Sequence, residues 1–398
     1  MAASYTATYS LGREAVTAAC FCTVWLSAAA TSLPKASSGP SMQLAATHQR
    51  AGFAAPRTVT VAPRSVSTAA TAPAAQGSMA PAATKDRAKG AVVGALVADA
   101  ATMGLHWIYD QGKLEQLLAS KGKQAAPEFF DPPSCPFYEM PSGSLSPYGG
   151  ELHALLRYMS QPAQAAAAAS KAPLDGPSWA AALASYFKDV YAGYKNKSVK
   201  SLIANIEAGK AYPATGDAED TQANSLCKLP LIAAVYAGSS ELPAAVEASV
   251  RAQQNNDASV TMGLAAAKIL EKVILGSSID EALAWAQQQG NLPPAEAQLV
   301  SAALAAKGEP FNTAAQKFGV ACSMPGAFQN ALLAAAGAKS YSDGIRTNML
   351  AGGDNCSRSV YLGALLGAAY GVDGVPQEWR AKVTGWQKME AAIDAVVV

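Results

Sequence analysis

From Lys85 onward the chain repeats one pattern: alanine-rich segments in which apolar side chains recur at helical spacing. No convincing stretch alternates apolar and polar residues, which is the pattern of a half-buried strand. Alanine has the highest helix propensity of all residues. The sequence therefore predicts an all-α fold, a single compact multi-helix domain over residues 85–398. A chain of this length can bury a substantial core.

The first helix is predicted over residues 85–110, and small side chains recur along it: Gly90, Ala91, Gly94, Ala95 and Ala98. Small side chains let a second helix approach closely, so this helix is predicted to lie at the centre of the fold. Asp99 lies within the same apolar run, where an unpaired carboxylate would be costly. Asp99 is therefore either a site residue or a carboxylate that bonds a neighbouring helix.

A glycine-containing turn precedes a second apolar helix in the segment AGGDNCSRSVYLGALLGAAYG, residues 351–371. Gly352 and Gly353 can adopt backbone conformations closed to other residues. Asp354 and Ser357 stand where this helix is predicted to begin, a position that favours short polar side chains. A carboxylate and a hydroxyl held there can bind a cation or a sugar hydroxyl. The alternative is that Asp354 only caps the helix.

Three segments resemble the ADP-ribosylglycohydrolase family. GGDNCS at residues 352–357 resembles the family's GGDTDT signature, and GAVVGALVADAATMGLHWIYD at residues 90–110 resembles its G-x-x-x-G-D-A-x-G helix. Leu229–Leu231 with Tyr236–Gly238 resembles its A-P-L…Y-A-G segment. The segments occur in the family's order, and their departures from its motifs resemble the J1-crystallin-like branch, which keeps the fold and alters the metal motif.

This resemblance implies hydrolysis of ADP-ribose glycosidic conjugates with two Mg²⁺ ions held mainly by carboxylates. It implies Asp354 and Ser357 as metal ligands. Cys356, however, stands where the family has a second aspartate, and a neutral thiol is a poor Mg²⁺ ligand. Where the family places T-D-D-T, glycines fill most of the register and Glu151 is the only carboxylate. Mg²⁺ is therefore expected to bind weakly or not at all, and Cys356→Asp is expected to raise its affinity.

Other site residues follow from the same resemblance. Asp99, Glu151 and Asp354 are expected to meet in one cleft and to position a cation or water. Glu219 and Asp220 are expected to supply the general base, or else to lie in a solvated loop with an Asx turn. Trp107 is also interpreted as a core residue. The residues expected to bind substrate are His106, Trp107, Tyr148, Gln222, Asn224, Gly352, Gly353 and Asn355.

Two functions remain open, with the first favoured. The first is a hydrolase with a rebuilt site that acts on an ADP-ribose-like small molecule or an ADP-ribosylated side chain. The second is a non-catalytic member that binds such a nucleotide or serves as a structural protein. The sequence has no P-loop, Rossmann fingerprint, zinc-ligand spacing or serine elbow. Its net charge of +1 gives no basic excess for binding nucleic acid.

Residues 1–84 differ in composition from the rest: they are rich in Ala, Ser, Thr and Pro, and Glu14 is their only acid. This is typical of an organelle transit peptide, for a plastid or a mitochondrion. The apolar run Ala18–Leu33 makes a secretory signal the alternative, although the run is short for a stable membrane span. The six cysteines show no regular framework, which indicates reduced thiols in an intracellular compartment.

Three further segments allow local predictions. The proline-rich residues 126–150 are predicted to form a long ordered loop that ends where a helix begins. Residues 165–173 are predicted to be a surface connection. Asp257 is predicted to cap a long helix that runs through Leu275.

Overall fold

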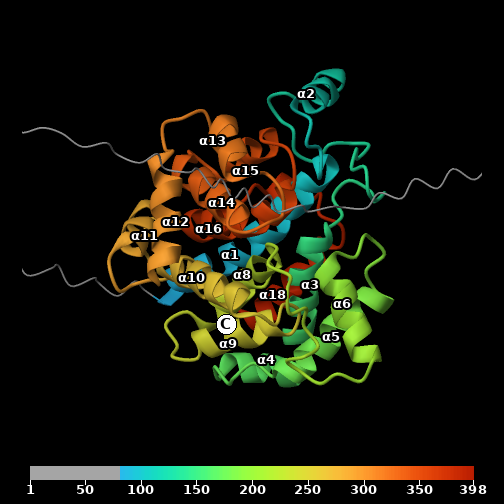
Figure 1. The fold of residues 1–398 in the computed structure, drawn as a ribbon, viewed down its shortest axis with the longest axis vertical. Helices are drawn as coiled ribbons and strands as arrows, with labels where there is room; N and C mark the ends of the chain where they lie inside the picture. The colour runs from blue at the N-terminus through green and yellow to red at the C-terminus, as the bar shows by residue number, and fades with distance from the viewer. Residues whose placement is uncertain (1–80) are drawn as a thin grey trace, which may run out of the picture. The chain divides into compact units, whose positions relative to one another are not determined.

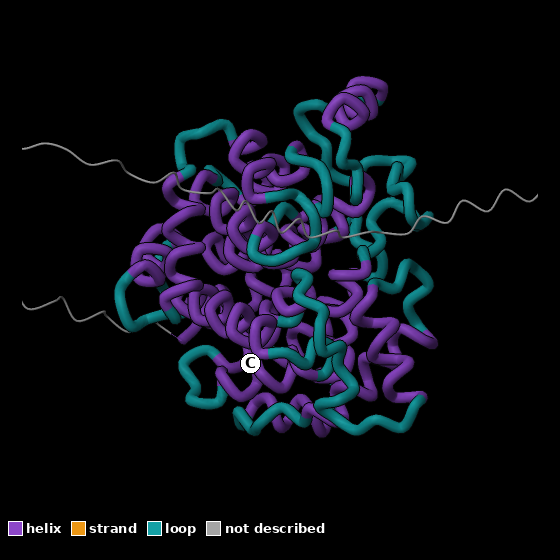
Figure 2. Tube along the Cα trace, in the orientation of Figure 1, coloured by secondary structure: helices purple, strands orange, loops and turns teal. Residues whose placement is uncertain are grey.

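A computed structural model describes residues 81–398 of the chain. Within this range the chain forms eighteen α-helices and one 3₁₀-helix and contains no strand (Figure 2). The predicted all-α class is confirmed. The predicted leader, residues 1–84, lies outside the described residues except for Pro81–Thr84, which begin the first helix.

The helices in the described range follow one another along the chain. The first half comprises α1 (Pro81–Thr102), the 3₁₀-helix (Met103–Leu105), α2 (Gln111–Ser120), α3 (Pro147–Met159), α4 (Pro162–Ala169), α5 (Gly176–Asp189), α6 (Lys197–Glu207), α7 (Asn224–Cys227), α8 (Leu229–Tyr236) and α9 (Leu242–Arg251). The second half comprises α10 (Asp257–Ile274), α11 (Ile279–Gln287), α12 (Pro294–Ala305), α13 (Phe311–Phe318), α14 (Gly326–Gly337), α15 (Tyr341–Leu350), α16 (Asn355–Gly374), α17 (Gln377–Arg380) and α18 (Trp386–Val396).

Helices α1 and α16 touch backbone to backbone at the centre of the fold (Figure 1). They run antiparallel, because Gly90 faces Gly367 and Gly94 faces Gly363. A Cβ atom added to Gly90 or to Gly94 would lie 2.2 Å from the carbonyl oxygen of the facing glycine. No larger side chain fits in this contact, so the small residues of α1 are a packing requirement and its predicted central position is confirmed.

Several helices pack directly on this pair. Helices α8, α10, α14 and α15 lie against it, and α3 joins it to the group formed by α5 and α6. Residues Ala83–Leu105 form the one segment in the described range that is long and apolar enough to cross a membrane, and 94% of its most apolar window is buried inside the protein. This burial is the behaviour of a core helix.

The antiparallel pairing brings the end of α1 to the beginning of α16. Just beyond α1, the Trp107 amide donates to the Gly353 carbonyl (2.9 Å), and the Gly353 amide donates to the Ile108 carbonyl (2.7 Å). The start of α3 joins the same region, because the Ser146 amide donates to the Asp99 carboxylate (2.7 Å). Three distant parts of the chain therefore meet in the interior.

One local prediction holds only in part and another is wrong. Helix α4 occupies residues 165–169 of the predicted connection, since alanine favours helix and Pro162 suits its first turn, and only residues 170–173 form the connection. Asp257 does not cap α10: the side chain of Asn256 accepts the amide of Ser259, whereas the exposed Asp257 pairs with Arg251. Asn256, one position before Asp257, has the extended backbone that a capping residue needs, and its side chain can accept the backbone amide.

Two other local features bear on the site. The prediction of a long non-helical loop is confirmed, because no helix lies between Ser120 and Pro147, where α3 begins. The first helix is shorter than predicted: it ends at Thr102, a 3₁₀ turn follows, and Trp107 has a left-handed backbone. The cysteines in the described range are free thiols: Cys135, Cys227, Cys322 and Cys356.

Candidate functional site

The carboxylate of Asp354, at the start of α16, accepts four hydrogen bonds from the protein. Its Oδ1 accepts from His106 Nε2 (2.9 Å) and from the Ser357 amide (3.2 Å). Its Oδ2 accepts from the Trp107 indole nitrogen (2.8 Å) and from the Tyr148 hydroxyl (2.8 Å). Asp354 is fully buried. The carboxylate is thus both the cap of α16 and the point where the ends of α1 and α3 are joined to it.

A chain of hydrogen bonds leads to Asp354 through His106. Because a carboxylate only accepts, His106 Nε2 must carry the hydrogen of that bond. His106 Nδ1 lies 2.8 Å from the Tyr138 hydroxyl. Burial alone raises the pKa of Asp354, but the charge and hydrogen bond of His106, together with the bonds from the indole and the phenol, lower that pKa to about 2. The site therefore keeps its carboxylate charged.

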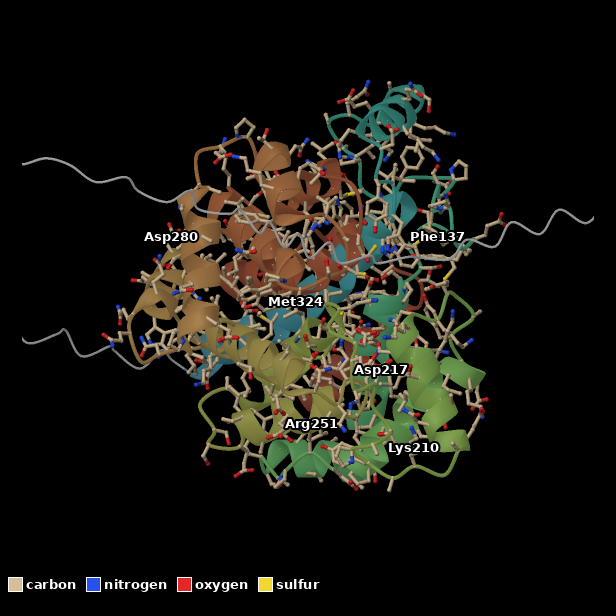
Figure 3. All side chains as sticks on the ribbon, in the orientation of Figure 1. Phe137, Lys210, Asp217, Arg251, Asp280 and Met324 are labelled. Atoms are coloured by element: carbon tan, nitrogen blue, oxygen red, sulfur yellow. The ribbon has the colours of Figure 1, made fainter. Side chains whose placement is uncertain are left out.

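Trp107 is held in a strained conformation over this carboxylate. Its φ of 63° lies in the left-handed region, which costs a non-glycine residue about 1–2 kcal/mol. Its ring stacks on His106 at 4.1 Å and meets the edges of Phe137 and Tyr194, each at 5.1 Å. Phe137, at the edge of the molecule in Figure 3, is 59% exposed. Trp107 is therefore both a packing residue and a hydrogen-bond partner of Asp354.

The second carboxylate, Asp99, lies beside the start of α3. The hydroxyl of Ser146 donates to its Oδ1 (2.5 Å), and the Ser146 amide donates to its Oδ2. A Cβ atom on Gly149 would lie 2.0 Å from Asp99 Oδ2, so this close approach requires glycine there. Burial raises the pKa of Asp99 to about 7, although the hydrogen bonds from Ser146 lower it. Gly149, which lies in the segment where the family's T-D-D-T motif was expected, therefore leaves room for the carboxylate of Asp99.

Glu151 belongs to a separate polar network. Its Oε1 accepts from the side-chain amides of Asn196 (2.9 Å), Asn224 (2.5 Å) and Gln253 (2.8 Å). Its Oε2 pairs with the ammonium of Lys228 at 3.0 Å. Lys228 also donates to the Asn224 carbonyl and to Gln253 Oε1. Both members of the ion pair are fully buried, and every oxygen and hydrogen of the pair has a partner in the protein.

The three expected carboxylates lie in one buried region but in different networks. The start of α3 connects them: Ser146 bonds Asp99, Tyr148 bonds Asp354, and Glu151 follows in the same helix. All three carboxylate side chains are fully buried.

The predicted loop acids are bonded within their own loop and make no hydrogen bond to Asp354. Asp217, labelled in Figure 3, accepts the amides of Glu219 (2.9 Å) and Asp220 (3.0 Å), which is an Asx turn. Glu219 is exposed, whereas Asp220 is buried. Gln222 donates its amide to Asp220 Oδ1 (2.8 Å). The two acids therefore do not form a side-by-side pair facing one space.

The turn before α16 is built as its glycines predict. Gly352 and Gly353 have φ values of 67° and 64°, which favour glycine. The side chain of Asn355 donates to the Leu105 carbonyl (3.2 Å), and the hydroxyl of Ser357 donates to the carbonyl of the capping residue (3.1 Å). These polar groups are used to hold the turn together.

Sequence reasoning missed several residues of these networks, among them Tyr138, Lys228 and Arg358. Arg358 is fully buried and donates to the carbonyls of Val320 (3.0 Å) and Gly352 (2.6 Å). A signal existed for Lys228, because it is a lone charge in the apolar run from Leu226 to Tyr236 and such a charge needs a buried partner.

Mg²⁺ does not fit the groups around Asp354. Magnesium needs oxygen lone pairs directed at it, whereas His106 and Trp107 direct N–H groups at this carboxylate. Burial also raises the pKa of the Cys356 thiol well above its usual value, so the thiol stays neutral. In residues 81–398, no group of three or more His, Cys, Asp or Glu side chains is arranged to hold a metal ion.

Comparisons with known proteins agree with this fold. The family model for ADP-ribosylglycohydrolase matches residues 80–398. Crystallin J1A of Tripedalia cystophora is 30% identical over 311 residues, which cover 74% of this chain and 90% of that crystallin. Crystallin J1B of the same organism is 29% identical over 306 residues, 72% of this chain and 89% of that crystallin.

A solved structure described as an ADP-ribosylglycohydrolase-related protein complex shares the fold. Its TM-score is 0.59 at 18% identity, over 79% of this chain and 98% of the other. The family model covers most of the chain, and the two crystallins match over about the same extent. The chain belongs to the ADP-ribosylglycohydrolase family, in the branch of the J1 crystallins.

Proposed function

We propose that this protein is a non-hydrolytic member of its family, whose buried polar centre stabilises the fold. One observation carries this proposal: the Asp354 carboxylate is fully buried and all four of its hydrogen bonds come from the protein. A cation or a substrate could reach this carboxylate only if Trp107 or Tyr148 moved. Each move would leave a buried donor without an acceptor, which costs about 1–3 kcal/mol.

The relatives support the same proposal, because both carry the name crystallin. A structural protein has no need of an open catalytic cleft, and its buried carboxylates can all be bonded internally. The hydrolase favoured by the sequence needs the opposite arrangement, in which carboxylates face a ligand.

A second candidate function is binding of an ADP-ribose-like nucleotide without hydrolysis. The strained backbone of Trp107 supports it, because strain of this kind persists mainly where function or packing requires it. The adjacent Phe137 ring is largely exposed and offers a surface on which a base could stack. A nucleotide would bind at this outer face of the aromatic cluster formed by His106, Trp107, Phe137, Tyr138 and Tyr194.

Hydrolysis assays test the first proposal. The protein is incubated with ADP-ribosylated arginine, ADP-ribosylated serine or O-acetyl-ADP-ribose, with and without Mg²⁺, beside an active family member. We expect no release of ADP-ribose above the buffer control. Mg²⁺-dependent release from any of the three would contradict the proposal. Thermal stabilisation by ADP-ribose without release would instead favour the second candidate.

The metal itself is tested by thermal unfolding. We expect Mg²⁺ at millimolar concentration to shift the Tm of the unmodified protein by less than about 1 °C, since an ion that does not bind the native state cannot stabilise it. Cys356→Asp is expected to gain a Mg²⁺ response, because it adds a carboxylate beside Thr102 and the Asp99 carbonyl, whereas the N–H groups of His106 and Trp107 are directed at Asp354. Cys356→Asn, which has a similar size and no charge, is the matched control. A shift of several degrees in the unmodified protein would contradict the expectation.

We also propose that residues 1–84 direct the protein to a plastid or a mitochondrion and are then removed. Their composition, with one acid and several arginines, supports this. N-terminal sequencing of the mature protein tests it, and a mature chain that begins at Met1 or Ala2 would contradict it.

A further inference from the structure

Half of the unpartnered buried polar side-chain atoms in residues 81–398 belong to the segment 220–225 and to Gln254, which is hydrogen-bonded to Asp220. Of eight such side-chain atoms, four are oxygen atoms of Asp220, Asn224, Ser225 and Gln254. Unpartnered buried polar atoms are uncommon in folded proteins, so a concentration of them needs an explanation. A bound ion or ordered water is the usual one.

The orientation of the Gln254 amide is determined by its surroundings. Its Nε2 lies near three acceptors: the Asp220 carbonyl (3.2 Å), Asp220 Oδ1 (3.1 Å) and the Gln222 carbonyl (3.0 Å). The reversed amide would set Oε1 against three acceptors, so nitrogen must occupy this position. Oε1 of the fully buried Gln254 is then left on the other side of the amide with no donor in the protein.

The carboxylate of Asp220 is only half satisfied. Its Oδ1 accepts from the Gln222 amide and from Gln254, whereas its Oδ2 has no partner. The residue is 3% exposed. The nearby ammonium of Lys197 pairs with Asp217 at 3.7 Å and leaves Asp220 without an ion pair. Burial raises the pKa of Asp220, so this carboxylate keeps its charge only with a positive or hydrogen-donating partner at the open oxygen.

We propose that Asp220 Oδ2 and Gln254 Oε1 bind a monovalent cation, Na⁺ or K⁺. The available atoms are all oxygens, which hard cations prefer. They carry one formal charge, from Asp220, whereas divalent sites usually collect more than one carboxylate. Asn224 Oδ1 and Ser225 Oγ, four and five residues further along the chain, are also unpartnered.

Such a cation would link the loop that contains Asp220 to the N-terminus of α10. The Asp220 carbonyl already accepts from Asn256 Nδ2 (2.9 Å) and Ser259 Oγ (3.2 Å), at the cap of that helix. Gln253, the neighbour of Gln254, bonds both Glu151 and Lys228. Cation binding would therefore stabilise the loop that adjoins the buried Glu151–Lys228 network.

Thermal unfolding of the full chain in different chloride salts tests the proposal. The salts are NaCl, KCl and tetramethylammonium chloride at one ionic strength. We expect Na⁺ or K⁺ to raise Tm by about 4 °C at concentrations far above its Kd, with saturation. Asp220→Asn should abolish this response, because it removes the charge. Glu219→Gln, which changes the exposed neighbouring acid, should respond like the unmodified protein.

The stability of Asp220→Asn in the absence of Na⁺ and K⁺ is a second test. In tetramethylammonium chloride, Asp220→Asn should be at least as stable as the unmodified protein, because its buried side chain no longer carries an unpaired charge. Sodium NMR line broadening by the unmodified protein, reversed by K⁺, should report the site independently of any variant.

Three outcomes would overturn the proposal. An equal Tm in all three salts, without line broadening, would assign these oxygens to water alone. A cation response that survives in Asp220→Asn would place the ion elsewhere. A response to Ca²⁺ or Mg²⁺ but not to Na⁺ or K⁺ would rule out a monovalent ion.

Discussion

Asp354 and Glu151 are both fully buried carboxylates, and each accepts four hydrogen bonds from the protein. They differ in what balances the charge. Glu151 has the ammonium of Lys228, with three side-chain amides around it. Asp354 divides its compensation between the ring of His106, which acts through charge and a hydrogen bond, and hydrogen bonds from a phenol, an indole and a backbone amide.

This fold therefore stabilises a buried negative charge in two different ways. An ion pair concentrates the compensation in one partner, so the loss of that partner leaves an uncompensated charge. Dispersed hydrogen bonds divide the compensation, so the loss of one donor removes only a part. The two kinds of compensation differ in how much unfolding free energy should be lost when a single partner of the carboxylate is removed.

The largest effect is expected when Lys228 is removed. Lys228→Met should lower the free energy of unfolding by about 3–5 kcal/mol, because it leaves Glu151 buried without its counter-charge. Chemical denaturation measures this loss. The double variant Glu151→Gln, Lys228→Met should recover most of it, since neither side chain then carries a charge.

A matched control lies on the surface, where Lys188 pairs with Glu207 at 2.8 Å and both are largely exposed. Lys188→Met should cost far less stability than Lys228→Met, because solvent and salt screen an exposed pair. If Lys228→Met cost no more than this control, Glu151 would have to be protonated or solvated, and the contrast with Asp354 would disappear.

The acid dependence of stability is the next largest effect. The folded-state pKa of Asp354, about 2, lies below its ordinary value of 3.8. Its contribution is therefore present above about pH 4 and is lost as the pH falls towards 2, a loss of about 2 kcal/mol. Denaturation between pH 2 and 5 of the unmodified protein and of His106→Gln measures this contribution by difference, because other carboxylates with lowered pKa values, such as Glu128 and Asp217, respond alike in both. His106→Gln should reduce the acid-dependent loss. An unchanged slope in His106→Gln would show that the imidazole does not stabilise the carboxylate.

Asp99 acts in another pH window and with the opposite sign. Burial raises its pKa to about 7, so the native state holds its proton where the unfolded chain has lost it. Stability from this group should therefore decrease as the pH rises from about 4 to 7 and level off above that range. Because the windows do not overlap, one pH series distinguishes the two carboxylates.

The smallest effect is expected from the loss of one dispersed donor. Tyr148→Phe removes one of the four hydrogen bonds to Asp354 and should cost about 1.5 kcal/mol, the low end for a bond to a charged group. Tyr186→Phe is the matched control, because the Tyr186 hydroxyl lies 3.0 Å from His153 Nδ1 and burial lowers the pKa of His153 to about 4, so this ring is neutral. Loss of this bond to a neutral group should cost less. A loss for Tyr148→Phe as large as that for Lys228→Met would show that Asp354 depends on a single partner after all.

Local patterns predicted much of the site's framework. The spacing of small residues in α1 predicted a central helix, and the glycines before Asp354 predicted the turn and the cap. The pairing of Gly94 with Gly363, however, involves residues far apart in the chain, and no local pattern identifies the partner. The same limit hid Lys228, whose position showed that it needs a partner but not that Glu151 supplies it.

The sequence by itself determined the all-α class, the family and the small contact surfaces of α1, because helix propensity, motif order and side-chain size are properties of short segments. Only the tertiary structure decided what the carboxylates do. Whether Asp354 faces a ligand or accepts bonds from Trp107 and Tyr148 depends on which side chains the antiparallel packing of α1 and α16 brings within about 3 Å, and hydrogen bonding is decided at that distance.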